Sequence, residues 1–240
     1  MWVEGAVMRT FLIGILAASI AATPAAAATR NFGVSSFTKI RVDGPYKVSV
    51  STGVPVFARA SGAPAAIDRV AIEVQGDTLV VHSSQSWGGF PGVDPGPVEI
   101  SIGTHDLTNA SLVGAGSLAI DRVKGLTFAL SIQGSGAGEI GEANADQLIV
   151  NLDGSASAKL GGRAGKLTVV ARGISSLNAS TLTTPNATIS AQGTATVDTN
   201  VTETAKINAW GPAMIRLAGR PSCTVKVSGS ASVNGCRSAQ

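Results

Sequence analysis

The chain is poor in aromatic and charged residues, which make up 4% and 14% of its 240 residues. A base-stacking platform for nucleic acid needs exposed aromatic rings, and phosphate binding needs a clustered basic face. The net charge is only +3, and its carriers are spread along the chain. Nucleic acid is therefore not an expected partner.

Histidine and cysteine are also scarce, with two of each. A hydrolytic triad needs a base, and the sequence places no partner beside His82 or His105. A zinc site needs three or four ligands at recognisable spacing, which these residues do not supply. Acidic residues do not gather as a catalytic pair either. We predict no catalytic residue, no metal site and no cofactor, and we do not expect an enzyme.

Long apolar runs are missing except at the amino end. Arg9 precedes the apolar run 11–22, and the alanines at 26–28 fit the small-residue rule for signal-peptide cleavage. We expect residues 1–28 to be a signal peptide, with residues 1–7 open to being an upstream start. A retained anchor is the alternative, although this run is shorter than the about 20 residues that span a bilayer. After cleavage we expect no transmembrane segment.

The two cysteines, Cys223 and Cys236, lie near the carboxyl end. In an exported chain such a pair favours a disulfide over a catalytic or metal-binding role, and free thiols are the alternative. Cys223 lies six residues before Gly229 and Cys236 seven after it. The bond is thus expected to cross the last repeat as a cap.

Glycine is abundant, with 29 residues, and seven of them recur at nearly constant spacing. The intervals between them are 20, 20, 19, 20, 18 and 18 residues. A period near 20 residues indicates stacked repeats, each burying its apolar face against its neighbours. The seven are Gly114, Gly134, Gly154, Gly173, Gly193, Gly211 and Gly229.

Around each glycine the even offsets are apolar or small and the odd offsets are mostly small and polar. This period of two predicts strands with one buried face, joined by turns such as 141–146 and 183–185. A coil of about 20 residues that rises by about 4.8 Å predicts a parallel β-solenoid. A right-handed β-helix is favoured and a left-handed one is the alternative. Small residues two places after each glycine are interpreted, with the glycines, as inner-corner packing positions: Gly116, Gly136, Ala156, Ser175, Ala195, Ala213 and Ala231.

Charged residues five places after the glycines form a column on the outer face. Stacking in register would place Glu139 beside Lys159 and Asp198 beside Arg216. Opposite charges on adjacent strands stabilise a sheet by roughly 0.2–1 kcal/mol. We interpret this column as a solvated stabilising ladder.

Residues 29–240 are expected to form one β-solenoid domain, with regular repeats over about 105–236 and less regular coils over 34–102. The segment 83–97 is rich in Gly and Pro and is expected to be a surface loop. Its aromatic residues Trp87 and Phe90, and also Trp210 on an odd offset, are the candidate ligand contacts. The alternative is that these rings cover the solenoid.

The segments FTKIRVDGPYKVSV (37–50) and VEISIGTHDLTNASLVGAG (98–116), with the SIQGSGAGEI-type cassettes, resemble the head GIN domain family. Its members are exported bacterial proteins that are often labelled as auto-transporter adhesins. The resemblance covers about residues 34–236. It implies a β-helical exported domain and brings no established catalytic residues.

The sequence therefore predicts a non-enzymatic β-solenoid that acts as an adhesion or binding module in the periplasm or at the bacterial cell surface. Its partner would be an envelope glycan or a surface protein, and its oligomeric state is left open. Two alternatives remain, a structural envelope scaffold without a specific ligand and a polysaccharide-active β-helix enzyme.

Overall fold

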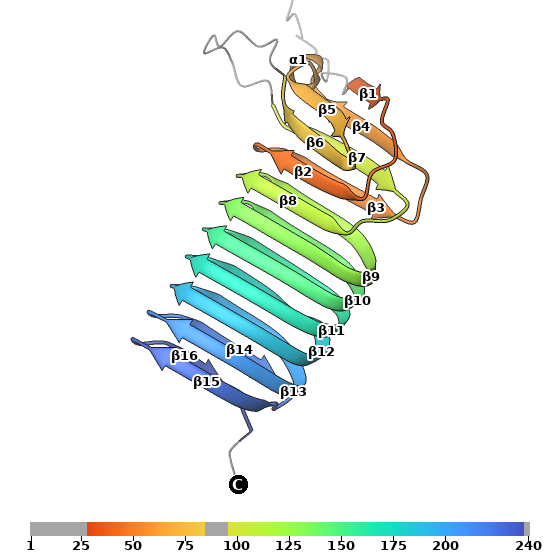
Figure 1. The fold of residues 1–240 in the computed structure, drawn as a ribbon. Helices are drawn as coiled ribbons and strands as arrows, with labels where there is room; N and C mark the ends of the chain where they lie inside the picture. The colour runs from red at the N-terminus through yellow and green to blue at the C-terminus, as the bar shows by residue number, and fades with distance from the viewer. Residues whose placement is uncertain (1–27, 85–95, 238–240) are drawn as a thin grey trace, which may run out of the picture.

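The structure, a computed structural model, describes residues 28–84 and 96–237. Strands stack one above another into a long column, with the carboxyl end of the chain at one end of it (Figure 1). Residues 1–27 of the predicted signal peptide, and Trp87 and Phe90, lie outside the described residues.

The column is a parallel β-solenoid of about six turns with roughly 20 residues per coil, as the repeat predicts. Each coil pairs in parallel with the coils before and after it, glycine beside glycine from Gly114 to Gly193. The strands of the column are β8 (Asn109–Gly114), β9 (Ser117–Gly134), β10 (Ala137–Gly154), β11 (Ser157–Gly173), β12 (Ser176–Gly193), β13 (Thr196–Trp210), β14 (Met214–Ala218), β15 (Ser222–Ser228) and β16 (Ser232–Asn234).

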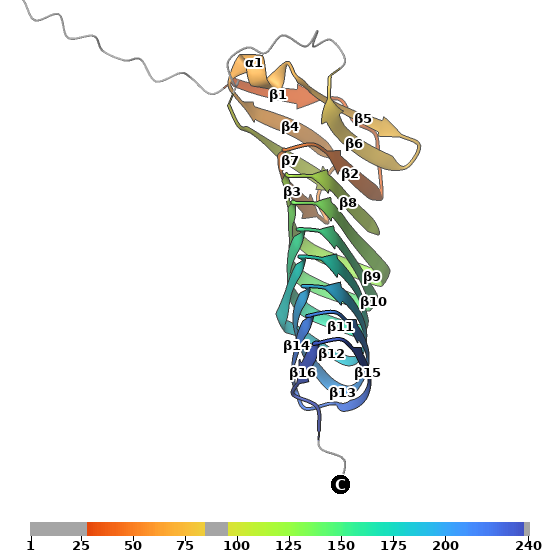
Figure 2. The same cartoon turned by 90° about the vertical axis from the view of Figure 1, so that its left-hand side faces the viewer.

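Two layers of strands face each other across the core (Figure 2). We call the segments that end at the repeated glycines the pre-glycine sheet and those that follow them the post-glycine sheet. The even offsets from both sheets point inward and are buried, for example Leu130, Ile132 and Leu118. The predicted alternation is thus the burial pattern of the fold.

The segments predicted as turns are instead paired with neighbouring coils. Strands β9 to β13 continue through them because the backbone keeps its parallel partners around the bend, as Ala143 does with Val123 and Gly162. The uneven repeat spacing is absorbed in these bends. Register shifts occur between residues 140 and 143, 159 and 161, and 179 and 186. The two main sheets therefore stay in register although the coils differ in length.

The repeated glycines are needed at the contact between coils and not at an inner corner, which corrects the sequence interpretation. Gly154 is half-buried with a φ of +89°, and an added Cβ would lie 2.7 Å from the carbonyl oxygen of Gly134. The residues two places on do face inward, and only Ala231 in the last coil is not fully buried. The close approach is thus between successive coils and not between opposite walls.

The amino-terminal part departs from the predicted coils. Strands β2 and β3 extend the two parallel sheets by pairing with β8 and β9, and β2 also pairs with β6 and β3 with β7. The pairs β1–β4, β4–β7 and β5–β6 are antiparallel, because this part has no repeat to keep its strands in one direction. Its elements are β1 (Ala28–Phe32), β2 (Lys39–Asp43), β3 (Lys47–Thr52), β4 (Phe57–Gly62), α1 (Pro64–Ile67), β5 (Val70–Gln75), β6 (Thr78–Ser83) and β7 (Val98–Thr104).

The disulfide between Cys223 and Cys236 is confirmed, with 5.7 Å between the two Cα atoms. Cys223 begins the last coil and Cys236 follows β16, so the bond closes that coil. Both side chains are partly buried against the core. In the chain-entropy model a loop of this size contributes about 3 kcal/mol.

Replacing Gly154 with Ala tests the contact between coils. We expect a loss of roughly 1–3 kcal/mol beyond that of Gly53→Ala, because an added Cβ at Gly154 meets the backbone of the preceding coil. Gly53 is a matched control, since its φ is +72° and nothing lies within 4 Å of an added Cβ. Urea unfolding of both variants measures the difference. Equal losses would show that the coil contact contributes nothing.

Candidate functional site

A shallow groove runs along the outer face of the post-glycine sheet. Three contiguous hollows of about 270, 500 and 300 Å³ form it. The first and second share Lys47, Ser117 and Ala137, and the second and third share Asn178. The groove therefore crosses the strands rather than following one of them.

Small residues, from Ser117 to Ser176, form the floor of the first two hollows of this groove. They belong to the column three places after the repeated glycines, which is continued in register by Lys47 on β3 at one end and reaches Met214 on β14 at the other. Six strand spacings of about 4.8 Å, from β3 to β14, give the whole groove a length of about 29 Å. The members of this column are Lys47, Ser117, Ala137, Ser157, Ser176, Thr196 and Met214. The first five line the first two hollows, whereas the third hollow is lined by Asn178, Ser180, Asp198, Thr199, Arg216 and Ala218.

The column five places after the glycines carries the charges, as predicted. Lys159 Nζ lies 3.0 Å from Glu139 Oε1, and Arg216 donates to Asp198 at 3.1 Å. At the amino end of the groove, Lys47 Nζ lies 2.6 Å from Glu99 Oε1. Each of these side chains is at least one-third exposed, so each pair contributes little to stability. The groove thus combines small floor residues with exposed groups of both signs.

On the outer face of the pre-glycine sheet, the column one place before the glycines holds no comparable ladder of ion pairs among the described residues. Asp153 and Arg172, which stand one place before their glycines, are paired in register, but no ion pair joins their side chains. Trp210 belongs to the same column, between Gln192 and Ser228, and is 42% exposed. It lies on the sheet opposite the groove. The structure therefore does not bring Trp210 into the groove.

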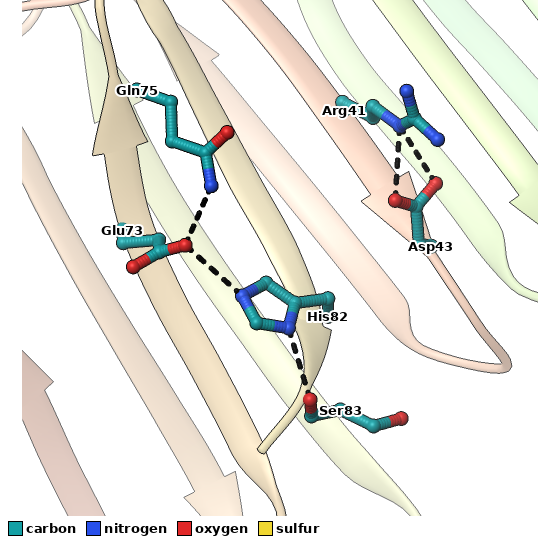
Figure 3. A network of polar contacts seen from close by, with 6 residues as sticks. All are labelled: Arg41, Asp43, Glu73, Gln75, His82 and Ser83. Atoms are coloured by element: carbon teal, nitrogen blue, oxygen red, sulfur yellow. Dashed lines mark hydrogen bonds and ion pairs between the residues drawn. The ribbon is translucent and has the colours of Figure 1, made fainter. Parts of the chain in front are cut away.

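His82 lies in a small polar network on the β5–β6 hairpin (Figure 3). Its Nε2 is 3.3 Å from Glu73 Oε1, and its Nδ1 is 2.9 Å from the carbonyl oxygen of Ser83. The amide of Gln75 donates to the same carboxylate at 2.7 Å. These hydrogen bonds, first from Gln75 and then from His82, lower the pKa of Glu73. The network is exposed, and it joins two adjacent strands.

His105 lines a separate cleft of about 380 Å³ where the repeats meet the amino-terminal part. Arg122, Lys124 and Asp106 also line it. The cleft shares no lining residue with the groove. The two histidines are thus on different elements and do not form one site.

Within residues 28–84 and 96–237, no group of three or more histidine, cysteine, aspartate or glutamate side chains could hold a metal ion. In that same part of the chain, no helix is long and apolar enough to cross a membrane.

Fold and groove together define a β-solenoid with an elongated groove on one outer face. The chain belongs to the family described as "Putative auto-transporter adhesin, head GIN domain", whose profile matches residues 36–221. A search of curated proteins found no match to this chain.

Solved structures share the fold at low identity. The chain is 19% identical to a structure titled a putative adhesin from Bacteroides fragilis, with a TM-score of 0.77 over 87% of this chain and 96% of that one. A structure titled a putative lipid binding protein from Parabacteroides distasonis has a TM-score of 0.68 at 19% identity, with the same coverage of 87% and 96%. A third, titled a putative adhesin from Parabacteroides merdae, has a TM-score of 0.63 at 17% identity and covers 86% and 95%.

The Glu139–Lys159 pair offers a test of the register on the groove face. Lys159→Glu should place two carboxylates side by side and destabilise the fold by roughly 0.2–1 kcal/mol. The swap Glu139→Lys with Lys159→Glu should restore most of the loss, because the outer neighbours Ala119 and Asn178 are neutral. Urea unfolding of the two singles and the double measures this. A double variant as unstable as the sum of the singles would contradict the pairing.

Proposed function

We propose that the protein is an exported, non-enzymatic binding module that attaches to an extended polymer at the bacterial cell envelope. The observation that carries this proposal is the groove, which crosses seven strands of the post-glycine sheet and has small residues on its floor from Ser117 to Ser176. A surface of this length suits a chain of many units better than a single small molecule. Family membership and the adhesin titles of similar structures support an adhesive role.

An envelope glycan is the polymer that we favour, with a surface protein as the other candidate. The serine hydroxyls at Ser117, Ser157 and Ser176 can donate to and accept from sugar hydroxyls. The ion pairs along the same groove offer exposed charged groups, which make stronger hydrogen bonds than neutral ones. The closely spaced small residues let a ribbon-like chain approach the backbone.

The carboxylates of the groove do not have the arrangement of a catalytic acid/base pair. Glu139 and Asp198, the two carboxylates that line the groove, are each held in an ion pair with a neighbouring cation. They are three coils apart in one column, so they are separated by about 14.4 Å along the axis. That is beyond the about 5–5.5 Å of a retaining carboxylate pair and also beyond the about 6.5–9.5 Å of an inverting pair.

Filling the groove tests this proposal. Ala137→Trp places a ring on the groove floor, and Ala129→Trp places the same ring on the outer face of the other sheet. Sacculi and surface polysaccharide from the source bacterium serve as probes in a sedimentation assay. We expect Ala137→Trp to weaken retention about tenfold or more, equivalent to about 1.4 kcal/mol, and Ala129→Trp to leave it unchanged.

The same assay separates the alternatives. A scaffold without a ligand would show no retention of the native protein. If Trp87→Ala with Phe90→Ala abolishes retention and Ala137→Trp does not, the contact surface is the 83–97 segment and the groove proposal is wrong. Release of soluble sugar from the polysaccharide would indicate the enzyme.

A further inference from the structure

The carboxyl end of the solenoid is an open end. Val225 and Val227 of β15 are paired in register with Ile207 and Ala209 of β13, so they stand in the inward columns. Their counterparts in the earlier coils are at most 1% exposed, whereas Val225 is 40% and Val227 46% exposed. The disulfide begins at Cys223 and leaves these two side chains uncovered.

The same end of the solenoid also has strand edges that are not paired with any other described strand. Strand β15 pairs only with β13, and β16 pairs only with β14, among the residues that the structure describes. Each strand thus presents one edge with unpaired N–H and C=O groups, which can template pairing with another strand. Both layers of the solenoid end in an edge here, one on each side of an apolar core.

The opposite end of the molecule is built differently. Strand β1 lies antiparallel on β4, and α1 contacts both strands and buries Ala66 and Ile67. The hairpin β5–β6 spreads from the same end (Figure 2). Such an end presents no coil onto which β15 and β16 could both stack. Head-to-tail addition of copies is therefore disfavoured.

We propose that two copies of this chain join at their carboxyl ends, through a two-fold axis perpendicular to the two sheets. This axis keeps each sheet on its own side and reverses the strand direction. It therefore pairs β15 with its copy and β16 with its copy, both antiparallel, and each layer continues from one solenoid into the next. A closed, isologous contact of this kind leaves neither edge free.

The side chains of β15 suit this arrangement. An axis through Val225 sets Lys226 opposite Thr224 of the copy, and an axis through Val227 sets it opposite Ser228. Either register covers the inward valines and keeps the two lysines from facing each other, which would be destabilising. The segment 222–237 carries Lys226 and Arg237 and no acid, so an acidic strand is the competing occupant.

The dimer would also place the two grooves on one side of the assembly, end to end. A polymeric ligand could then engage both copies, which raises apparent affinity through effective concentration. This consequence rests on the proposed function, whereas the dimer itself does not. Its test is therefore made without any ligand.

Sedimentation equilibrium of the purified protein, from low micromolar to several hundred micromolar, tests the dimer. We expect the mean mass to rise from one chain toward two and no further. Val225→Lys with Val227→Lys should hold the mass at one chain throughout. The fold should survive because both side chains are already exposed, and circular dichroism checks this. As a matched control, Ser131→Lys with Ser190→Lys adds the same charge to the outer face of the same sheet and should leave the dimer intact.

A native protein that stays at one chain mass over the whole range would overturn the proposal. So would masses that grow beyond two chains, which would indicate head-to-tail stacking. A dimer that survives the valine substitutions would place the contact elsewhere. Added salt should favour the proposed dimer by screening its like-charged ends, whereas an acidic occupant would bind less well in salt.

Discussion

The close approach of one coil to the next at the repeated glycines constrains the whole solenoid. At Gly154 the backbone has a positive φ, and the carbonyl oxygen of Gly134 occupies the place of a side chain. Gly134 and Gly173 repeat the same geometry toward their own neighbours. Each of these glycine contacts sets the position of one coil on its neighbour. Both sheets therefore stay in register, and the outer columns become straight rows of equivalent positions. The groove and its charge ladder depend on that regularity.

Much of this could be predicted from sequence. The alternation around each glycine gives the inward and outward faces, and the equal offsets of Glu139 and Lys159 correctly predict their contact. The cysteine pair predicts the bond in the last coil. These predictions are correct because, in coils that stack in parallel and in register, residues at the same offset from their glycines lie side by side.

Other features could not be predicted in this way. The segment 141–146 looks like a turn by composition, but its backbone pairs with the adjacent coils, and pairing depends on neighbours far away in sequence. The amino-terminal strands have no period, so the sequence gives no direction to β4 or β5. The sequence does not predict the groove, because Ser117, Ala137 and Ser157 have the composition of ordinary outward-facing residues. Only the structure shows that they line contiguous hollows. Aromatic residues are the stronger signal in the sequence, but Trp210 lies on the other sheet.

Equivalent positions of successive coils stack in one outer column, and the amino-terminal strand β2 continues this column beyond β8. Gln133 and Ser228 stand five coils apart in one outer column, and Asp43 stands two coils further along it. Spin labels at Gln133 and Ser228 should be separated by about 24 Å, and labels at Asp43 and Ser228 by about 34 Å. Pulsed electron paramagnetic resonance measures both distances, with labelled chains diluted into unlabelled protein. Narrow distributions that differ by about two strand spacings would support the account, whereas broad distributions, or two equal distances, would contradict it.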